Sequence, residues 1–95
     1  MKYESDMNAK LIKIRTLLKR IDPDMHYGDW IRALMAVYYE TKGSEEGFEI
    51  ADYWSSKGDK YKGEKDVRKY WRGFKPNYAK PVRMGTLVRM ADMAV

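Results

Sequence analysis

The sequence predicts an all-α domain, a small bundle of about five short helices around a central apolar helix, with few or no strands. Apolar residues recur at spacings of three and four in several segments, and no segment shows the sustained period of two that strands require. The stretch 27–40 carries charge only at Asp29, Arg32 and Glu40. Because a helix that is apolar on most of its circumference must be covered on several sides, we expect this stretch at the centre.

The first expected helix runs to about Arg20, with Ser5 as its N-cap. Its apolar seam follows spacings of four and three, and it consists of Met7, Leu11, Ile14, Leu18 and Ile21, broadened by Ile12 and Leu17. Pro23 ends this helix, because the residue before a proline disfavours the α region. Asp22 and Asp24 flank the proline in a turn, where aspartates initiate turns and cap helices. We prefer that role to a Mg²⁺ site, which would need a further carboxylate.

The central helix is expected over 27–40, with His26 as a cap or surface residue at its start and Gly43 as a left-handed cap at its end. Ser44 is the expected N-cap of a third helix. The inward stripe of that helix consists of Phe48, Ile50, Ala51 and Trp54.

The polar, glycine-rich stretch 55–63 predicts a loop before a fourth helix over 64–74. That helix packs through Val67, Trp71 and Phe74, and Pro76 closes it. A second loop over 77–80 leads to a last helix from about residue 85, whose inward residues are Leu87, Met90, Ala91 and Ala94.

Charge is distributed unevenly along the chain. Residues 1–21 carry six basic against two acidic side chains, residues 22–56 carry two against eight, residues 57–83 carry ten against three, and residues 84–95 balance. The net charges of the four segments are therefore +4, −6, +7 and zero. A chain so polarised has a preferred side for a polyanion, and the alternative is that each charged run is only a solvated face.

Composition argues against most catalytic and metal sites. The chain has no cysteine and a single histidine, His26, so thiolate and His-rich metal sites are excluded. A triad of Ser44 or Ser55 with His26 and an Asp lacks the strand-turn-helix setting, and no P-loop motif occurs. No apolar run is long enough to span a membrane and the N-terminus does not resemble a signal peptide, so we expect a cytoplasmic domain with no membrane partner.

Basic residues alternate with aromatic residues after Trp54, a pattern that favours nucleic acid binding. Lys and Arg displace counterions from phosphates, and aromatic rings stack on unpaired bases. Trp30, Trp54 and Trp71 lie on apolar faces and are expected in the core. The candidate contacts are Lys57, Lys60, Lys62, Lys65, Arg68, Lys69, Arg72, Lys75, Lys80 and Arg83, with Tyr61 and Tyr78 in the loops as stacking residues.

The order and spacing of five short pieces resemble the primase C-terminal domain family called PriCT-2. The pieces are Tyr27-x-x-Trp30 with Ala33-x-x-Ala36, Gly47-Phe48, Trp54-Ser55, Tyr70-Trp71-x-x-Phe74, and Gly85-Thr86-Leu87-x-x-Met90-Ala91. The end of the chain stops short of the family's usual small-residue and glycine ending. We expect a single helical domain over 1–95 with a PriCT-2-like core over 21–91, and residues 1–20 either pack on that core or link to a preceding domain.

The resemblance implies a non-catalytic helical domain of a phage or plasmid primase-polymerase, which assists primer synthesis by binding single-stranded DNA template. The alternative is a module that docks the neighbouring primase-polymerase and helicase domains, with the acidic segment 22–52 against a basic partner. A third hypothesis is an initiating-nucleotide site for ATP with Mg²⁺, whose phosphates are held by Lys60, Lys62 or Arg83. No other cofactor is expected.

Overall fold

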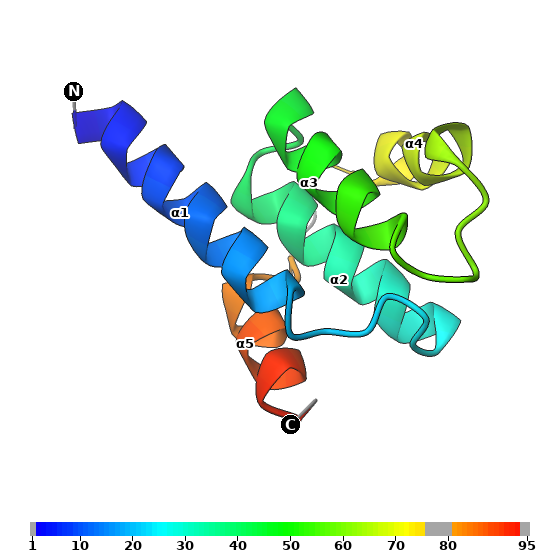
Figure 1. Ribbon diagram of the computed structural model, residues 1–95. Coiled ribbons are helices and arrows are strands. Elements are labelled where there is room, and N and C mark those ends of the chain that lie inside the picture. The colour runs from blue at the N-terminus through cyan, green and yellow to red at the C-terminus, as the bar shows by residue number, and fades with distance from the viewer. Residues whose placement is uncertain (1, 76–80, 94–95) are drawn as a thin grey trace.

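The computed structural model describes residues 2–75 and 81–93, with side chains from Met7 onward. Within these residues the chain forms five α-helices and no strands, which confirms the all-α prediction (Figure 1). The helices are α1 (Lys2–Leu18), α2 (Tyr27–Glu40), α3 (Glu45–Ser55), α4 (Glu64–Gly73) and α5 (Met84–Met93).

Helix α2 is the centre of the bundle, as its composition predicts. It packs against α3, α4 and α5, while α1 packs against α3 and α5. Figure 1 shows α1 and α4 on opposite sides of the pair formed by α2 and α3. Ala33, Leu34, Ala36 and Val37 of α2 are completely buried. This apolar helix is therefore covered by three other helices.

The predicted seam of α1 is correct, but its start and its width are not. Leu11, Ile14, Leu18 and Ile21 are buried. Helix α1 begins at Lys2, so Ser5 lies inside the helix and is not its N-cap, because no helix-breaking residue precedes it. Ile12 is exposed and Leu17 is only partly buried, because α1 lies at the edge of the bundle and is covered on one side.

Two predicted N-caps are confirmed. The His26 side chain accepts a hydrogen bond from the Gly28 N–H at 3.2 Å, and the Ser44 hydroxyl accepts one from the Gly47 N–H at 3.1 Å. Each cap satisfies an amide that has no partner within the first turn of its helix. Together they define the starts of α2 and α3.

The corner between α2 and α3 depends on two glycines, Gly43 and Gly47. Gly43 has φ +69° and its N–H donates to the Tyr38 carbonyl at 2.8 Å, which closes the last turn of α2 as predicted. Lys42 is also left-handed, with φ +55°. A side chain at Gly47 would overlap the Thr41 hydroxyl, so glycine is required where α3 crosses the end of α2.

The three tryptophans belong to the core, as their positions predict. Trp54 and Trp71 are buried, and Trp30 packs against the core while partly exposed. A buried indole needs a partner for its N–H. The Trp54 indole donates to the Ile21 carbonyl at 2.9 Å, and the Trp30 indole donates to the Ser55 hydroxyl at 3.0 Å.

Candidate nucleic-acid interface

Asp24 fixes the loop that precedes α4. Its carboxylate accepts hydrogen bonds from the N–H groups of Asp59 and Lys60, both at 2.8 Å, and these bonds lower the pKa of Asp24. A Cβ at Gly58 would lie 2.5 Å from a carboxylate oxygen of Asp24, so glycine permits this close approach. The carboxylate of Asp22 accepts the N–H of Asp24 at 2.9 Å. These aspartates therefore organise the turn, which is the role that the sequence favours over a Mg²⁺ site. They also hold in place the loop that contains Lys60 and Lys62.

Helix α4 divides into a buried side and a charged side. Val67 and Trp71 are buried against the bundle. The opposite side borders an open groove of about 840 Å³, which we call the α4 groove. Its lining residues are Glu45, Glu64, Lys65, Arg68, Lys69 and Arg72.

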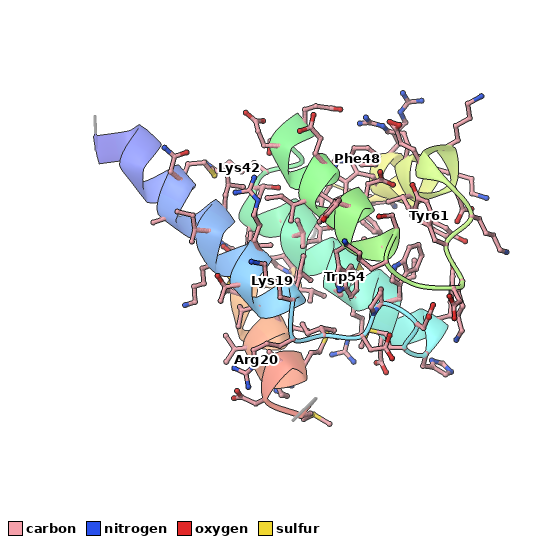
Figure 2. All side chains as sticks on the ribbon, viewed as in Figure 1. Lys19, Arg20, Lys42, Phe48, Trp54 and Tyr61 are labelled. Atoms are coloured by element: carbon pink, nitrogen blue, oxygen red, sulfur yellow. The ribbon has the colours of Figure 1, made fainter. Side chains whose placement is uncertain are left out.

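Arg68 uses its charge within the domain. Its guanidinium donates to both carboxylate oxygens of Glu45 on α3, at 2.9 and 2.6 Å, and lies 3.5 Å from the centre of the Phe48 ring. Figure 2 shows Phe48 on the side of α3 that faces α4. The guanidinium lowers the pKa of Glu45, and Glu45 raises the pKa of Arg68. Arg68 therefore joins α3 to α4 and is less available to a phosphate than its neighbours.

The other cations of the α4 groove are more accessible. Lys69 is exposed and lies 3.9 Å from Asp66 on its own helix. Lys65 and Arg72 are exposed, and none of the described carboxylates lies within ion-pair distance of either. Lys65, Lys69 and Arg72 therefore form the part of the groove that can meet an anion.

An aromatic cavity of about 450 Å³ lies beside the α4 groove, between α4, the start of α2 and the loop. Tyr27, Trp30, Tyr61 and Tyr70 line it, together with Lys60 and Lys62. The ring centres of Tyr27 and Trp30 lie 5.9 and 5.4 Å from that of Tyr70, both edge-on. The Lys69 ammonium lies 5.3 Å from the centre of the Tyr70 ring, so Tyr70 connects the cavity to the groove.

The tyrosines of the cavity differ in accessibility. Tyr61 is partly buried and its hydroxyl donates to Asp52 at 2.8 Å; burial and this carboxylate raise the pKa of Tyr61 to about 12. Tyr27 is 58% exposed, and the adjacent Tyr70 hydroxyl raises the pKa of Tyr27. Tyr27 is not among the predicted contacts, because the sequence predicts the whole stretch 27–40 at the centre of the bundle. Tyr27 is the first residue of its helix and lies at the edge of the core. This position is the signal that could have identified it.

The remaining candidates lie elsewhere. Lys57 lies over the Tyr53 ring, with its ammonium 4.5 Å from the ring centre. Lys75 is exposed just after α4, and Arg83 contacts Glu40. Lys80 and Tyr78 lie outside the described residues. The predicted cations that the structure describes therefore do not form one surface, and Lys60, Lys62, Lys65, Lys69 and Arg72 lie on neighbouring sides of the loop and α4.

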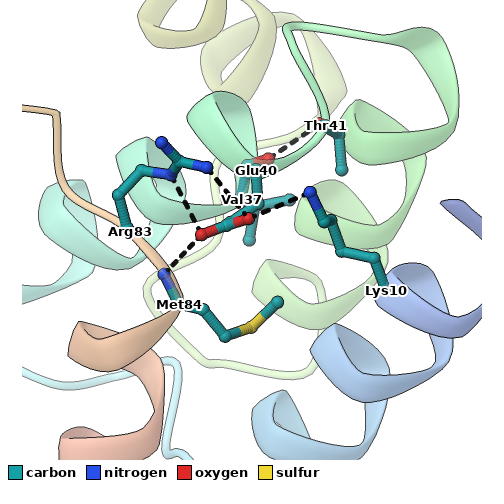
Figure 3. A network of polar contacts seen from close by, with 6 residues as sticks. All are labelled: Lys10, Val37, Glu40, Thr41, Arg83 and Met84. Atoms are coloured by element: carbon teal, nitrogen blue, oxygen red, sulfur yellow. Dashed lines mark hydrogen bonds and ion pairs between the residues drawn. The ribbon is translucent and has the colours of Figure 1, made fainter. Parts of the chain in front are cut away.

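Arg83 belongs to a polar network around the buried Glu40 carboxylate at the end of α2 (Figure 3). The Glu40 carboxylate accepts hydrogen bonds from Arg83 Nε at 3.0 Å and the Met84 N–H at 2.8 Å, and its other oxygen lies 3.3 Å from Lys10 Nζ. Burial raises the pKa of Glu40, but the bonds from Arg83, Met84 and Lys10 outweigh it and the pKa falls below its ordinary value. Glu40 therefore joins α2 to α5 and to α1. Glu40 lies roughly 20 Å along α2 from Tyr27. Arg83, which is bound to Glu40, is therefore too far away to act in the aromatic cavity.

Among residues 2–75 and 81–93, no group of three or more His, Cys, Asp or Glu side chains is placed to hold a metal ion. Within the same residues, no helix combines the length and the apolar character needed to cross a membrane.

The family model described as primase C terminal 2 (PriCT-2) matches residues 14–91, which begin inside α1 and end in α5. No curated protein and no solved structure matches the chain.

Proposed function

Because the chain belongs to the PriCT-2 family of primase-associated C-terminal domains, we propose that it is a non-catalytic accessory domain that binds single-stranded DNA template during primer synthesis. The binding surface is the α4 groove with the adjoining aromatic cavity. The observation that carries the proposal is the position of Lys69, which borders the groove and lies over the ring of Tyr70 in the cavity. Such a domain would work in the cytoplasm with the replication proteins of a phage or plasmid.

Phosphates bind along the outer side of α4. Lys65, Lys69 and Arg72 lie at positions i, i+4 and i+7, so they follow one side of the helix over roughly 10 Å. Their release of counterions makes the affinity fall with salt. Lys60 and Lys62 add two cations on the side of the loop that Asp24 holds, where Asp59 and Asp66 line the same cavity.

Bases stack beside the phosphates on the aromatic cavity. An exposed tyrosine ring accepts any base, because every base has a π-face. Tyr27 is the most accessible ring of the cavity and Tyr70 supports it from the side. The proposal therefore predicts binding with strong salt dependence and little sequence preference.

Fluorescence anisotropy with a labelled single strand tests the proposal. The variant Lys65→Gln/Lys69→Gln/Arg72→Gln should make the salt dependence of log K shallower by about 2 units, which corresponds to three lost phosphate contacts. Arg68 is left intact, because its removal would also break the contact between α3 and α4.

The matched control is Lys13→Gln/Arg20→Gln/Arg89→Gln, which removes three exposed cations from other surfaces and gives the same net charge. Equal loss of affinity in both triple variants would show that only net charge matters and would remove the site. Tyr27→Ala should weaken binding about tenfold with an unchanged salt slope, because it removes stacking and no charge.

The aromatic cavity also supports a second function, binding of an initiating nucleotide. Its volume of about 450 Å³ suits a small molecule, and Lys60 and Lys62 lie at its wall while Arg83 is too distant. Titration with ATP and Mg²⁺, followed by amide chemical shifts, should then move signals of the loop and of the start of α2. Absence of shifts up to millimolar ligand would remove this function and leave template binding standing.

Docking of neighbouring primase-polymerase and helicase domains through the acidic segment 22–52 has less support. Four of its carboxylates already have partners in the domain: Asp24 with loop amides, Glu40 with Arg83, Glu45 with Arg68 and Asp52 with Tyr61. Binding to a separately purified primase-polymerase domain, at salt that abolishes DNA binding, would reverse this ranking.

A further inference from the structure

A second cavity, of about 460 Å³, lies between α1 and α3, and we call it the α1–α3 cavity. Its floor is apolar and consists of Leu18, Ile21, Ile50 and Trp54, all of which are buried in the core. Its residues do not overlap with those of the α4 groove, and it shares only Pro23 with the aromatic cavity. Figure 1 shows α1 and α4 on opposite sides of α3, so this cavity and the α4 groove lie on different sides of that helix.

Three cations border the α1–α3 cavity. Arg15, Lys19 and Lys57 are exposed, whereas Glu49 is the one acidic residue of its lining. No carboxylate of the described residues lies within ion-pair distance of these three cations. The rim therefore carries a net positive charge that the domain itself does not neutralise.

Two of these cations converge on Tyr53, which is 66% exposed. The Lys57 ammonium lies 4.5 Å from its ring centre, and Lys57 and then Lys19 lower the pKa of the Tyr53 hydroxyl. The phenol thus lies in a positive field between α1 and α3. An anion placed here would contact cations that follow the ends of both helices, Lys19 after α1 and Lys57 after α3.

The floor favours an apolar side chain over a nucleic acid base. Three of its four residues are aliphatic, and the Trp54 indole N–H is already bound to the Ile21 carbonyl at 2.9 Å. The Tyr53 ring has Lys57 over one face, which leaves less of it for stacking. Apolar anchors that insert into grooves, with charges at the rim, are typical of peptide recognition.

We propose that the α1–α3 cavity docks an acidic segment of a partner protein. The segment inserts a large apolar side chain over Ile50 and Trp54 and places carboxylates against Arg15, Lys19 and Lys57. Charge complementarity of this kind sets partner choice and association rate. The proposal does not rest on DNA binding, and the positions of the two surfaces allow the domain to hold template and partner together.

Selection from a displayed library of random short peptides on the immobilised domain tests this proposal. Selected peptides should combine acidic residues with one or two large apolar residues. Affinity for the variant Arg15→Gln/Lys19→Gln should be about tenfold weaker. Replacing the apolar residues of a selected peptide by serine should abolish binding.

The matched control is Lys13→Gln/Arg20→Gln, which removes the same charge from the same end of α1 at positions that do not line the cavity. Figure 2 shows Lys19 on the side of Trp54, whereas Arg20 lies lower in the view, beside α5. Affinity of a selected peptide should be retained in this control. Equal weakening in both double variants would overturn the proposal.

Chemical shifts locate the bound peptide. The indole N–H of Trp54 and the amides of Lys19, Ile50 and Tyr53 should move on titration. A library without acidic apolar binders, or shifts confined to other surfaces, would overturn the proposal. So would shifts of the cavity residues with an oligothymidylate in place of the peptide, or self-association that the Arg15→Gln/Lys19→Gln variant abolishes, because the occupant would then be a nucleic acid or a second copy.

Discussion

The junction of α2 with α5 and the junction of α3 with α4 are both made by a glutamate and an arginine, in contrasting surroundings. The Glu40 side chain is 7% exposed and meets Arg83, Lys10 and the Met84 N–H (Figure 3). The Glu45 side chain is 61% exposed and meets Arg68 at the rim of the α4 groove. A buried charge that loses its partners is costly, whereas an exposed pair contributes little because water and salt replace the contact.

The contrast distinguishes an arginine that stabilises the fold from one that lies at the rim of the α4 groove. Arg83 cannot leave Glu40 without taking one partner from a carboxylate whose side chain is only 7% exposed, so it is part of the fold. Arg68 loses less by exchanging Glu45 for a phosphate, because the released Glu45 side chain is 61% exposed. The Arg68 side chain, at 24% exposed, nevertheless stays less available than the other cations of the α4 groove. Two arginines that the sequence places in the same basic segment therefore have different roles.

The largest expected effect comes from breaking the buried junction. Glu40→Gln keeps the shape of the side chain but removes the charge that Arg83 and Lys10 share, and it should lower the free energy of unfolding by about 2 kcal/mol. Urea denaturation followed by circular dichroism measures this loss. Glu46→Gln, an exposed carboxylate in the first turn of α3, is the control and should lower the midpoint much less, because it loses only its interaction with the helix dipole. Equal loss of unfolding free energy in both variants would mean that the contacts of Glu40 stabilise the fold no more than an exposed carboxylate does.

The same junction should make stability depend on acid pH. The pKa of Glu40 in the folded state is below its ordinary value of 4.5, so the unfolded state takes up the proton first as pH falls. The stabilisation from Glu40 is therefore complete above about pH 5 and is lost as pH falls through 4.5 towards the folded pKa. Urea midpoints of the wild type and of Glu40→Gln should converge over this window. A constant difference between them down to about pH 2 would contradict the assignment.

Periodicity along the chain predicted most of the fold, because it reports which face of a helix meets the core. Leu11, Ile14, Leu18 and the tryptophans followed that rule, and the local caps His26 and Ser44 were visible within a few residues. Ile12 did not follow it, because the number of neighbours around α1 is a property of the whole bundle.

The candidate site could be predicted only in part, because partners distant in sequence decide which charges are available. Arg68 pairs 23 residues away with Glu45, and Arg83 pairs 43 residues away with Glu40. A helical wheel shows which side of one helix faces outward, but not which residues of other elements lie opposite that side. Tyr27 likewise meets a partner distant in sequence, Tyr70 on α4, whose ring centre lies 5.9 Å from its own.

Breaking the exposed junction should affect DNA binding more than stability. Glu45→Gln releases Arg68 and removes a negative charge from the α4 groove, so affinity for a single strand should rise about threefold at low salt if the groove binds phosphates. Anisotropy measures the gain. Glu46→Gln changes the net charge equally but does not line the groove, and it should give a smaller increase. An identical increase in both would show a general charge effect.

The smallest expected effect separates the two junctions by their response to salt. A double-mutant cycle of Glu45→Gln and Arg68→Gln should show a weak coupling in unfolding free energy that disappears at about 1 M NaCl, where charges are screened within about 3 Å. The cycle of Glu40→Gln and Arg83→Gln should retain most of its coupling, because salt does not reach a carboxylate with 7% exposure as readily. Because Arg68 also lies over Phe48, its single variant loses that contact in both salts, and only the coupling isolates the ion pair. If both couplings fell by the same fraction, burial would not be what distinguishes Arg83 from Arg68.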